Sequence, residues 1–191
     1  DAVQGSGTIE LTSSIALSDQ VTIDSGKTII LDMNGETLSI GFSDSSKNLI
    51  VNNGTLTITG DGTFDATEAT SYKGFINNYG TLAVENGTFQ IADKAMAVHL
   101  RNQDGGKAVI NGGTFSGGAT IVRSFEGSNT TITGGSFTNS VYPAVDVNGE
   151  TLITGGIFTN TSCSRCDSQN WGYTVRSGVD NDPDAKLTIT P

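Results

Sequence analysis

The sequence predicts an all-β solenoid, a coil of short parallel strands that stack turn upon turn. Three observations support this: an internal repeat of 21 to 26 residues, short strands with period-2 alternation, and glycine or asparagine at the junctions between them. Repeats of this length are typical of solenoids. The chain has 191 residues, and we expect about seven turns, or rungs, in a single domain that spans residues 1–191.

A short motif that ends in phenylalanine marks each rung. Residues 54–64 read GTLTITGDGTF and residues 80–89 read GTLAVENGTF. The phenylalanines that close the five cognate segments are spaced 25, 26, 22 and 21 residues apart: Phe64, Phe89, Phe115, Phe137 and Phe158. This spacing predicts that each ring stacks on the ring of the next rung inside the coil.

Each rung is expected to contain three short strands joined by tight corners. In the segment 55–59, Leu56 and Ile58 alternate with threonines, which is the period of a strand with one buried face. Glycine and asparagine suit the corners because they adopt positive φ at low cost. Asparagines at repeated corners are expected to form amide ladders: Asn52, Asn53, Asn77, Asn78 and Asn102. A β-sandwich is the main structural alternative.

The ends and insertions complete the predicted architecture. Residues 1–20 are expected to form an N-terminal cap, because an open solenoid end exposes apolar interior and strand edges. Residues 21–191 would hold the rungs, with a long loop insertion at 159–173. Further insertions at 42–48 and 65–73 are expected to contribute to a rim on the same side.

The segments KTIILDMNGETLSI (27–40) and GTLTITGDGTF (54–64) resemble rungs of the right-handed parallel β-helix of the pectate-lyase-like superfamily. They are closest in style to adhesin-like repeats of bacterial surface proteins. The resemblance implies a right-handed coil and an extracellular or cell-surface location. It implies little about activity, because one scaffold hosts many functions.

The catalytic motifs of that superfamily are not found in this chain. The RxPxxR pattern of the pectate lyases does not follow any of the arginines in the predicted strands, and the paired aspartates and Gly-His-Gly segment of the polygalacturonases are missing. We therefore predict no catalytic residue and no metal site. No cofactor is expected, and calcium, which pectate lyases hold with clustered acidic residues, is not indicated.

Charge and cysteine content limit the classes of binding partner and the cellular compartment that we expect. The formal net charge is −10, which argues against attraction to nucleic acid or to an anionic membrane. No apolar run is long enough to span a bilayer, so membrane insertion is not expected. Cys163 and Cys166 are compatible with a local disulfide, a pair of unreacted thiols, half of a zinc site or a redox pair. We favour the disulfide, which fits an oxidising extracellular setting.

One line of charged residues is the first candidate binding site. If Val98 and Leu100 point inward, His99 and Arg101 point outward. The matching outward positions of later rungs are Ile121 and Arg123, Ala144 and Asp146, and Thr174 and Arg176, so that Arg101, Arg123, Asp146 and Arg176 would form a line. Such a line is either a solvated face with ordinary cross-strand pairing or a groove for an acidic or hydroxyl-rich polymer, because arginine pairs with carboxylates in bidentate fashion.

The insertion at 159–173 is the second candidate. Its Trp171 and Tyr173 would offer a flat apolar platform with a polar edge to a sugar ring or to a protein; alternatively, Trp171 caps the last rung. These features predict a non-catalytic, secreted or cell-surface, adhesin-like module that binds a polysaccharide, a glycoprotein or another protein surface. The alternatives are a polysaccharide lyase or hydrolase and a passive surface stalk, and no oligomeric state is predicted.

Overall fold

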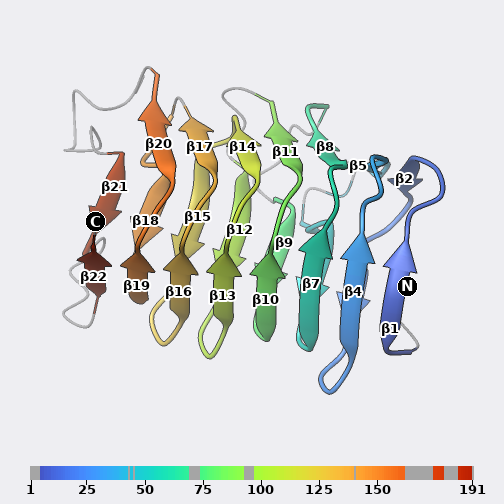
Figure 1. Cartoon of the computed structure of the whole chain (residues 1–191), viewed down its shortest axis with the longest axis horizontal. Helices are drawn as coiled ribbons and strands as arrows, with labels where there is room; N and C mark the ends of the chain where they lie inside the picture. Colours follow the sequence, from blue (N-terminus) through green and yellow to red (C-terminus); the bar gives the residue numbers. More distant parts are fainter. Residues whose placement is uncertain are drawn as a thin grey trace.

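The computed structural model of the chain is an all-β parallel solenoid of about six turns (Figure 1). It describes residues 5–42, 44, 46–68, 74–92, 97–139, 141–161, 174–178 and 185–190. The predicted solenoid is thus confirmed. About seven rungs were expected. Two of the three sheets have seven strands, and the chain makes six turns in passing from the first of seven stacked strands to the last.

Three parallel sheets form the walls of the coil, and we number them in the order in which the chain enters them. Sheet 1 has eight strands: β1 (Gly7–Glu10), β4 (Thr28–Asp32), β7 (Thr55–Thr59), β10 (Thr81–Val84), β13 (Lys107–Ile110), β16 (Asn129–Ile132), β19 (Glu150–Ile153) and β22 (Lys186–Ile189). Sheet 2 has seven: β2 (Ile15–Leu17), β5 (Thr37–Ile40), β8 (Thr63–Ala66), β11 (Thr88–Ile91), β14 (Thr114–Ser116), β17 (Ser136–Asn139) and β20 (Ile157–Asn160). Sheet 3 also has seven: β3 (Val21–Ile23), β6 (Ile50–Asn52), β9 (Ile76–Asn78), β12 (Val98–Asn102), β15 (Thr120–Ser124), β18 (Val145–Val147) and β21 (Val175–Ser177).

The predicted phenylalanine stack runs along the inner face of sheet 2. Successive rings from Phe64 to Phe158 lie 4.7, 4.5, 5.0 and 4.7 Å apart between centroids and are tilted by 10° or less. The glycine before β14, β17 and β20 makes room for the ring: at Gly113 and Gly135, for example, φ is 99° and 101° and an added Cβ would press on the following phenylalanine. The stack therefore fixes the register of every rung of sheet 2 that it crosses.

A buried amide ladder follows the inner face of sheet 3. Asn52 donates to Asn78 over 2.7 Å, Asn78 donates to Asn102 over 2.8 Å, and Asn102 donates to Thr130 Oγ1 over 2.9 Å. The prediction was wrong for the other two asparagines. Asn53 is exposed, and Asn77 lies on the outside, where it donates to the hydroxyl of Tyr79; at both positions the side chain points away from the coil.

The first turn begins earlier than the sequence suggested. β1 pairs with β4 and β2 pairs with β5 in parallel, so Gly7–Glu10 and Ile15–Leu17 of the expected cap already belong to the sheets. At this end the interior opens into a hollow of about 180 Å³ with an apolar lining. Ile9 and Ile15 are 40% and 41% exposed there.

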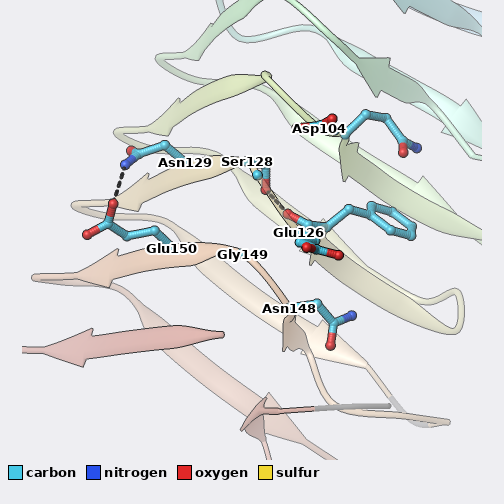
Figure 2. A pocket seen from close by; sticks show the side chains of 10 residues that line it. Asp104, Glu126, Ser128, Asn129, Asn148, Gly149 and Glu150 are labelled. Carbon is cyan, nitrogen blue, oxygen red and sulfur yellow. Dashed lines mark hydrogen bonds between the residues drawn. The ribbon is translucent and has the colours of Figure 1, made fainter. Parts of the chain in front are cut away.

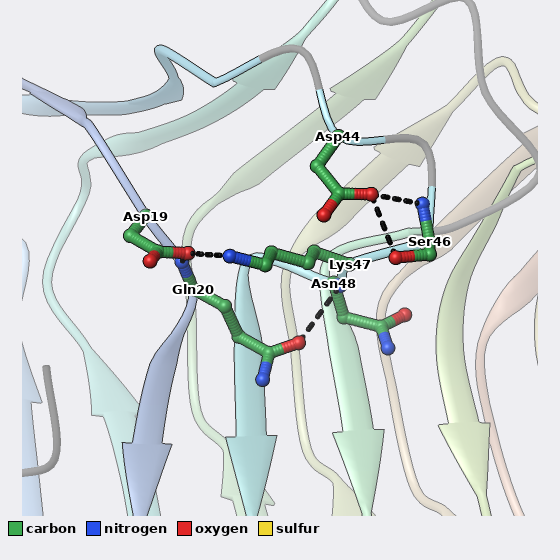
Figure 3. Close-up of polar contacts among 6 residues, drawn as sticks. All are labelled: Asp19, Gln20, Asp44, Ser46, Lys47 and Asn48. Atoms are coloured by element: carbon green, nitrogen blue, oxygen red, sulfur yellow. Dashed lines mark hydrogen bonds and ion pairs between the residues drawn. The ribbon is translucent and has the colours of Figure 1, made fainter.

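The insertion at 42–48 is tied to the first turn by polar contacts (Figure 3). Lys47 Nζ lies 2.6 Å from Asp19 Oδ1, and the backbone N–H of Asn48 donates to the side-chain oxygen of Gln20. The hydrogen bond from Lys47 is the main reason that the pKa of Asp19 is lowered. Asp44 accepts hydrogen bonds from the backbone and the hydroxyl of Ser46, which shapes the loop. These contacts fasten the described part of the loop to the first turn.

Candidate functional site

The charged line predicted on sheet 3 is present on its outer face. Arg101 lies opposite Arg123, Arg123 lies opposite Asp146, and Asp146 lies opposite Arg176 in the pairing of β12, β15, β18 and β21. The alignment of these four residues is thus confirmed, and we call them the arginine ladder. Their formal charges sum to +2, three arginines less one aspartate, in a chain whose net charge is −10.

Asp146 is the buried centre of the ladder. Its side chain is 6% exposed and accepts hydrogen bonds at Oδ1 from Arg176 Nη2 over 3.1 Å and Nε over 3.3 Å. Arg123 Nε lies 3.5 Å from the other carboxylate oxygen. A buried carboxylate needs such partners, because leaving it unpaired is costly. Asp146 therefore holds the two arginines in position and is largely shielded from solvent.

The other half of the ladder places two cations side by side. Arg101 and Arg123 lie opposite one another on neighbouring strands. The pKa of Arg101 is lowered, mainly by burial and to a lesser extent by repulsion from Arg123. The guanidinium of Arg123 also lies 5.1 Å from the centre of the Phe125 ring, a cation–π contact. Its side chain is 33% exposed, compared with 15% for Arg176. Arg123 is thus more accessible to a ligand than Arg176.

His99 was wrongly assigned to the outer face. It is 1% exposed and packs inside between Phe75 and Phe115, with ring centroids 5.4 and 6.0 Å away. Its Nε2 lies 3.2 Å from the carbonyl oxygen of Gly117, and Nδ1 has no hydrogen-bond partner within the described residues. Burial lowers the pKa of His99 to about 4. This side chain belongs to the core and cannot contact an external ligand.

The error has a physical cause at the corner where the chain enters sheet 3. Here two consecutive residues are buried in each of the five rungs from β6 to β18, so the strict alternation assumed for β12 fails. The pairs are Leu49 and Ile50, Phe75 and Ile76, His99 and Leu100, Ile121 and Val122, and Ala144 and Val145. Ile121 and Ala144, which were also expected to face outward, are 0% exposed.

The second predicted site cannot be placed. Trp171, Tyr173, Cys163 and Cys166 lie outside the described residues, so their roles stay predictions. Among the residues that are described, no three His, Cys, Asp or Glu side chains are grouped as they would be around a metal ion.

The sequence analysis missed a hollow at the corner between sheets 3 and 1 (Figure 2). It measures about 870 Å³, and we call it the corner groove. The connections at 103–106 and 125–128 have four residues each, whereas the next one, at 148–149, has two. The longer connections project outward and stack, with the N–H of Gly105 donating to the carbonyl of Gly127 over 3.2 Å. The groove lies beside them, where Asn148 and Gly149 form the shorter corner.

Acceptor groups dominate the corner groove. Asp104 and Glu126 are exposed carboxylates on the projecting connections. Glu150 also lines it, but accepts hydrogen bonds from Lys186 over 2.7 Å and from Asn129 over 3.2 Å. Asn148 is 7% exposed, and its Oδ1 accepts no hydrogen bond from any described residue. The groove therefore offers carboxylate oxygens to a ligand, with the unsatisfied amide of Asn148 at its wall.

The groove lies at the ends of three strands that carry members of the ladder. Gln103, Phe125 and Asn148 line the groove and each lies two residues after a member of the ladder on β12, β15 or β18. Phe125 contacts both, because its ring carries the guanidinium of Arg123. A basic line and an acidic hollow are thus adjacent on one side of the solenoid.

Comparisons of the chain with protein-family models, with curated proteins and with solved structures found no match. No described residue lies in a helix long and apolar enough to cross a membrane. A proposal on function therefore rests on the fold and on the chemistry of this surface.

Proposed function

We propose that this solenoid is a non-catalytic module of the cell surface or extracellular space that binds an acidic polysaccharide along the arginine ladder. The observation that carries the proposal is the register of Arg101, Arg123 and Asp146 on neighbouring strands. Neighbouring strands lie about 4.8 Å apart, so the ladder places Arg101 and Arg123 on adjacent strands and Arg176 two strands further on. A polymer with repeating carboxylates is the natural complement.

The chemistry of the guanidinium group favours this class of ligand. Arginine binds carboxylates through two parallel hydrogen bonds and stays charged at any physiological pH. Arg101 and Arg123 repel one another, and an anion between them would reduce that repulsion. The resemblance of the rungs to the β-helix repeats of bacterial surface proteins supports a role outside the cell, and one in binding or adhesion.

A titration with acidic and neutral sugars tests the proposal. Oligomers of galacturonic acid and of galactose of equal length are added to the purified chain in a calorimeter, with and without calcium. We expect the acidic oligomer to bind and the neutral one to bind at least about tenfold more weakly, independently of calcium. Binding of neither oligomer would favour a passive stalk, and release of unsaturated sugars would favour a lyase.

Two substitutions in the ladder should act in opposite directions. Arg123→Ala removes one charged hydrogen-bond donor and should weaken binding about tenfold. Asp146→Asn removes the competing carboxylate and should strengthen it. Lys107→Ala is the matched control, because Lys107 is an exposed cation on sheet 1. Equal losses for Arg123→Ala and Lys107→Ala would indicate non-specific attraction and remove the ladder as a site.

A further inference from the structure

We propose that the corner groove is a second binding site, separate from the arginine ladder, and that it takes an amino sugar with a protonated amine. The proposal rests on the groove's own chemistry. It would hold even if the ladder bound nothing, since the two surfaces carry opposite charge.

The groove has an excess of acceptors over donors. Several donors at its wall are engaged within the protein: Gln103 Nε2 with Asn77 over 2.6 Å, Ser128 Oγ with the carbonyl of Phe125 over 2.6 Å, and Asn129 Nδ2 with Glu150 over 3.2 Å. The last two bonds are drawn in Figure 2. In contrast, Asp104 and Glu126 are exposed carboxylates. A ligand that fits must therefore bring donors, and a positive charge would be favoured.

Asn148 supplies an independent indication that something binds here. Its side chain is almost fully buried at 7% exposure, and its Oδ1 accepts no hydrogen bond from the described residues. A buried amide oxygen without a donor is costly. Asn148 lines the groove, and because its terminal torsion is soft, a half-turn of the amide would exchange the positions of its oxygen and its nitrogen. A hydroxyl or ammonium donor from a ligand would satisfy the oxygen.

A sugar fits the groove better than a peptide does. Peptides that bind to β-structure pair with free strand edges, but the backbone at this corner is already used by the stack. Ser128 N–H donates to the carbonyl of Phe125 over 3.0 Å, and Glu150 N–H donates to the carbonyl of Ser128 over 2.9 Å. The ring of Phe125 is half-buried and carries the guanidinium of Arg123 on one face; its remaining exposed surface is apolar and suits the C–H face of a sugar ring. The volume, about 870 Å³, lies within the range of small-ligand sites.

The test compares two trisaccharides with the same sugar backbone, one with free, protonated amines and the other with neutral, acetylated ones. Chitotriose with free amines and its fully N-acetylated form are titrated into the full chain at a pH at which the amine is protonated. We expect the free amine to bind at least about tenfold more tightly. Equal affinities, or no binding of the free amine, would overturn the proposal.

Variants locate the site. Glu126→Gln should weaken binding of the free amine about tenfold, and Asn148→Ala should weaken it several-fold without a change in net charge. Glu68→Gln removes an equivalent exposed carboxylate elsewhere and should have little effect. Similar losses for Glu126→Gln and Glu68→Gln would mean general attraction to an acidic protein and would overturn the assignment.

The galacturonate titration separates this proposal from the function proposed above. Glu126→Gln should leave galacturonate binding intact or slightly strengthened, since a nearby negative charge is removed. A chain that binds galacturonate and ignores chitotriose keeps the ladder and loses the groove. The converse result keeps the groove and loses the ladder.

Discussion

The inner column of sheet 2 and the outer column of sheet 3 behave in opposite ways along the same solenoid. The inner column repeats one residue five times, from Phe64 to Phe158, with ring spacings that vary by only 0.5 Å between 4.5 and 5.0 Å. The outer column changes at most turns: Val51, Asn77, Arg101, Arg123, Asp146 and Arg176. Both columns occupy equivalent positions in successive turns.

The difference reflects what each column must satisfy. Inside, each ring needs a partner of matching shape above and below, so one residue type recurs. Outside, the scaffold places few demands on a side chain, and charge can be concentrated without a loss of packing. Three of the chain's ten lysines and arginines lie in the ladder. Such a concentration is what the binding proposed above would require.

The largest expected effect comes from breaking the inner column. Phe115→Ala should lower the free energy of unfolding by about 3–5 kcal/mol, because it leaves a cavity between two stacked rings. Urea denaturation followed by circular dichroism measures this change. Thr131→Ala, on the outer face of sheet 1, is the control and should cost less than about 1 kcal/mol. A loss for Phe115→Ala no larger than that of the control would contradict the role of the stack.

Acid should weaken the same core through His99. In the unfolded chain the imidazole takes up a proton near pH 6.5, but in the folded chain only near about 4. Between these values the unfolded state binds more protons, so stability falls as the pH falls from 6.5 toward 4. The shift corresponds to about 3 kcal/mol. Urea denaturation across this range, with His99→Leu as the comparison, should show a smaller loss in the variant; parallel curves would exclude His99 as the cause.

Breaking the amide ladder should lower the free energy of unfolding less than breaking the phenylalanine stack. Asn78 donates to Asn102 and to two backbone carbonyls and accepts from Asn52. Asn78→Ala would leave these buried groups without a partner and should lower the free energy of unfolding by about 1–3 kcal/mol. Asn53→Ala, at an exposed corner, should change it by less than about 0.5 kcal/mol. Equal effects in thermal denaturation would refute the distinction between inner and outer asparagines.

The smallest effect on stability is expected in the outer column. Arg123 is one third exposed and lies 3.5 Å from Asp146, so Arg123→Ala should cost no more than about 1 kcal/mol. The same variant should weaken binding of galacturonate about tenfold, as argued above. A large loss of stability with unchanged binding would mean that this column serves the scaffold after all.

Much of the fold could be predicted because a phenylalanine occupies the same position in successive repeats and so shows where each rung ends. The fixed Phe at the end of each motif and the alternation before it set the rungs, the inner stack and the alignment of the arginine ladder. His99 was misplaced because alternation was extended through a corner that carries no glycine. The neighbouring rungs held the missing signal, since consecutive apolar pairs such as Phe75 and Ile76 cannot alternate between inside and outside.

The corner groove could not be predicted from composition, because it depends on a difference in length between successive corners. Its walls arise because the corner from Asn102 to Lys107 is two residues longer than the corner from Val147 to Glu150. That difference in corner length can be read from the sequence once the strands of sheets 3 and 1 are aligned. The unpartnered oxygen of Asn148 follows from three-dimensional packing alone, so no pattern in the sequence could have predicted it.

Parallel stacking also determines how the solenoid would respond to force. The backbone hydrogen bonds between successive turns run along the long axis of the coil, as the order of strands in Figure 1 implies. A pull on the two ends therefore stretches one turn's bonds at a time, as in opening a zipper, instead of shearing many together. Extension should release a rung of some 21 to 26 residues per step, and the stacked Phe rings would separate in the same sequence.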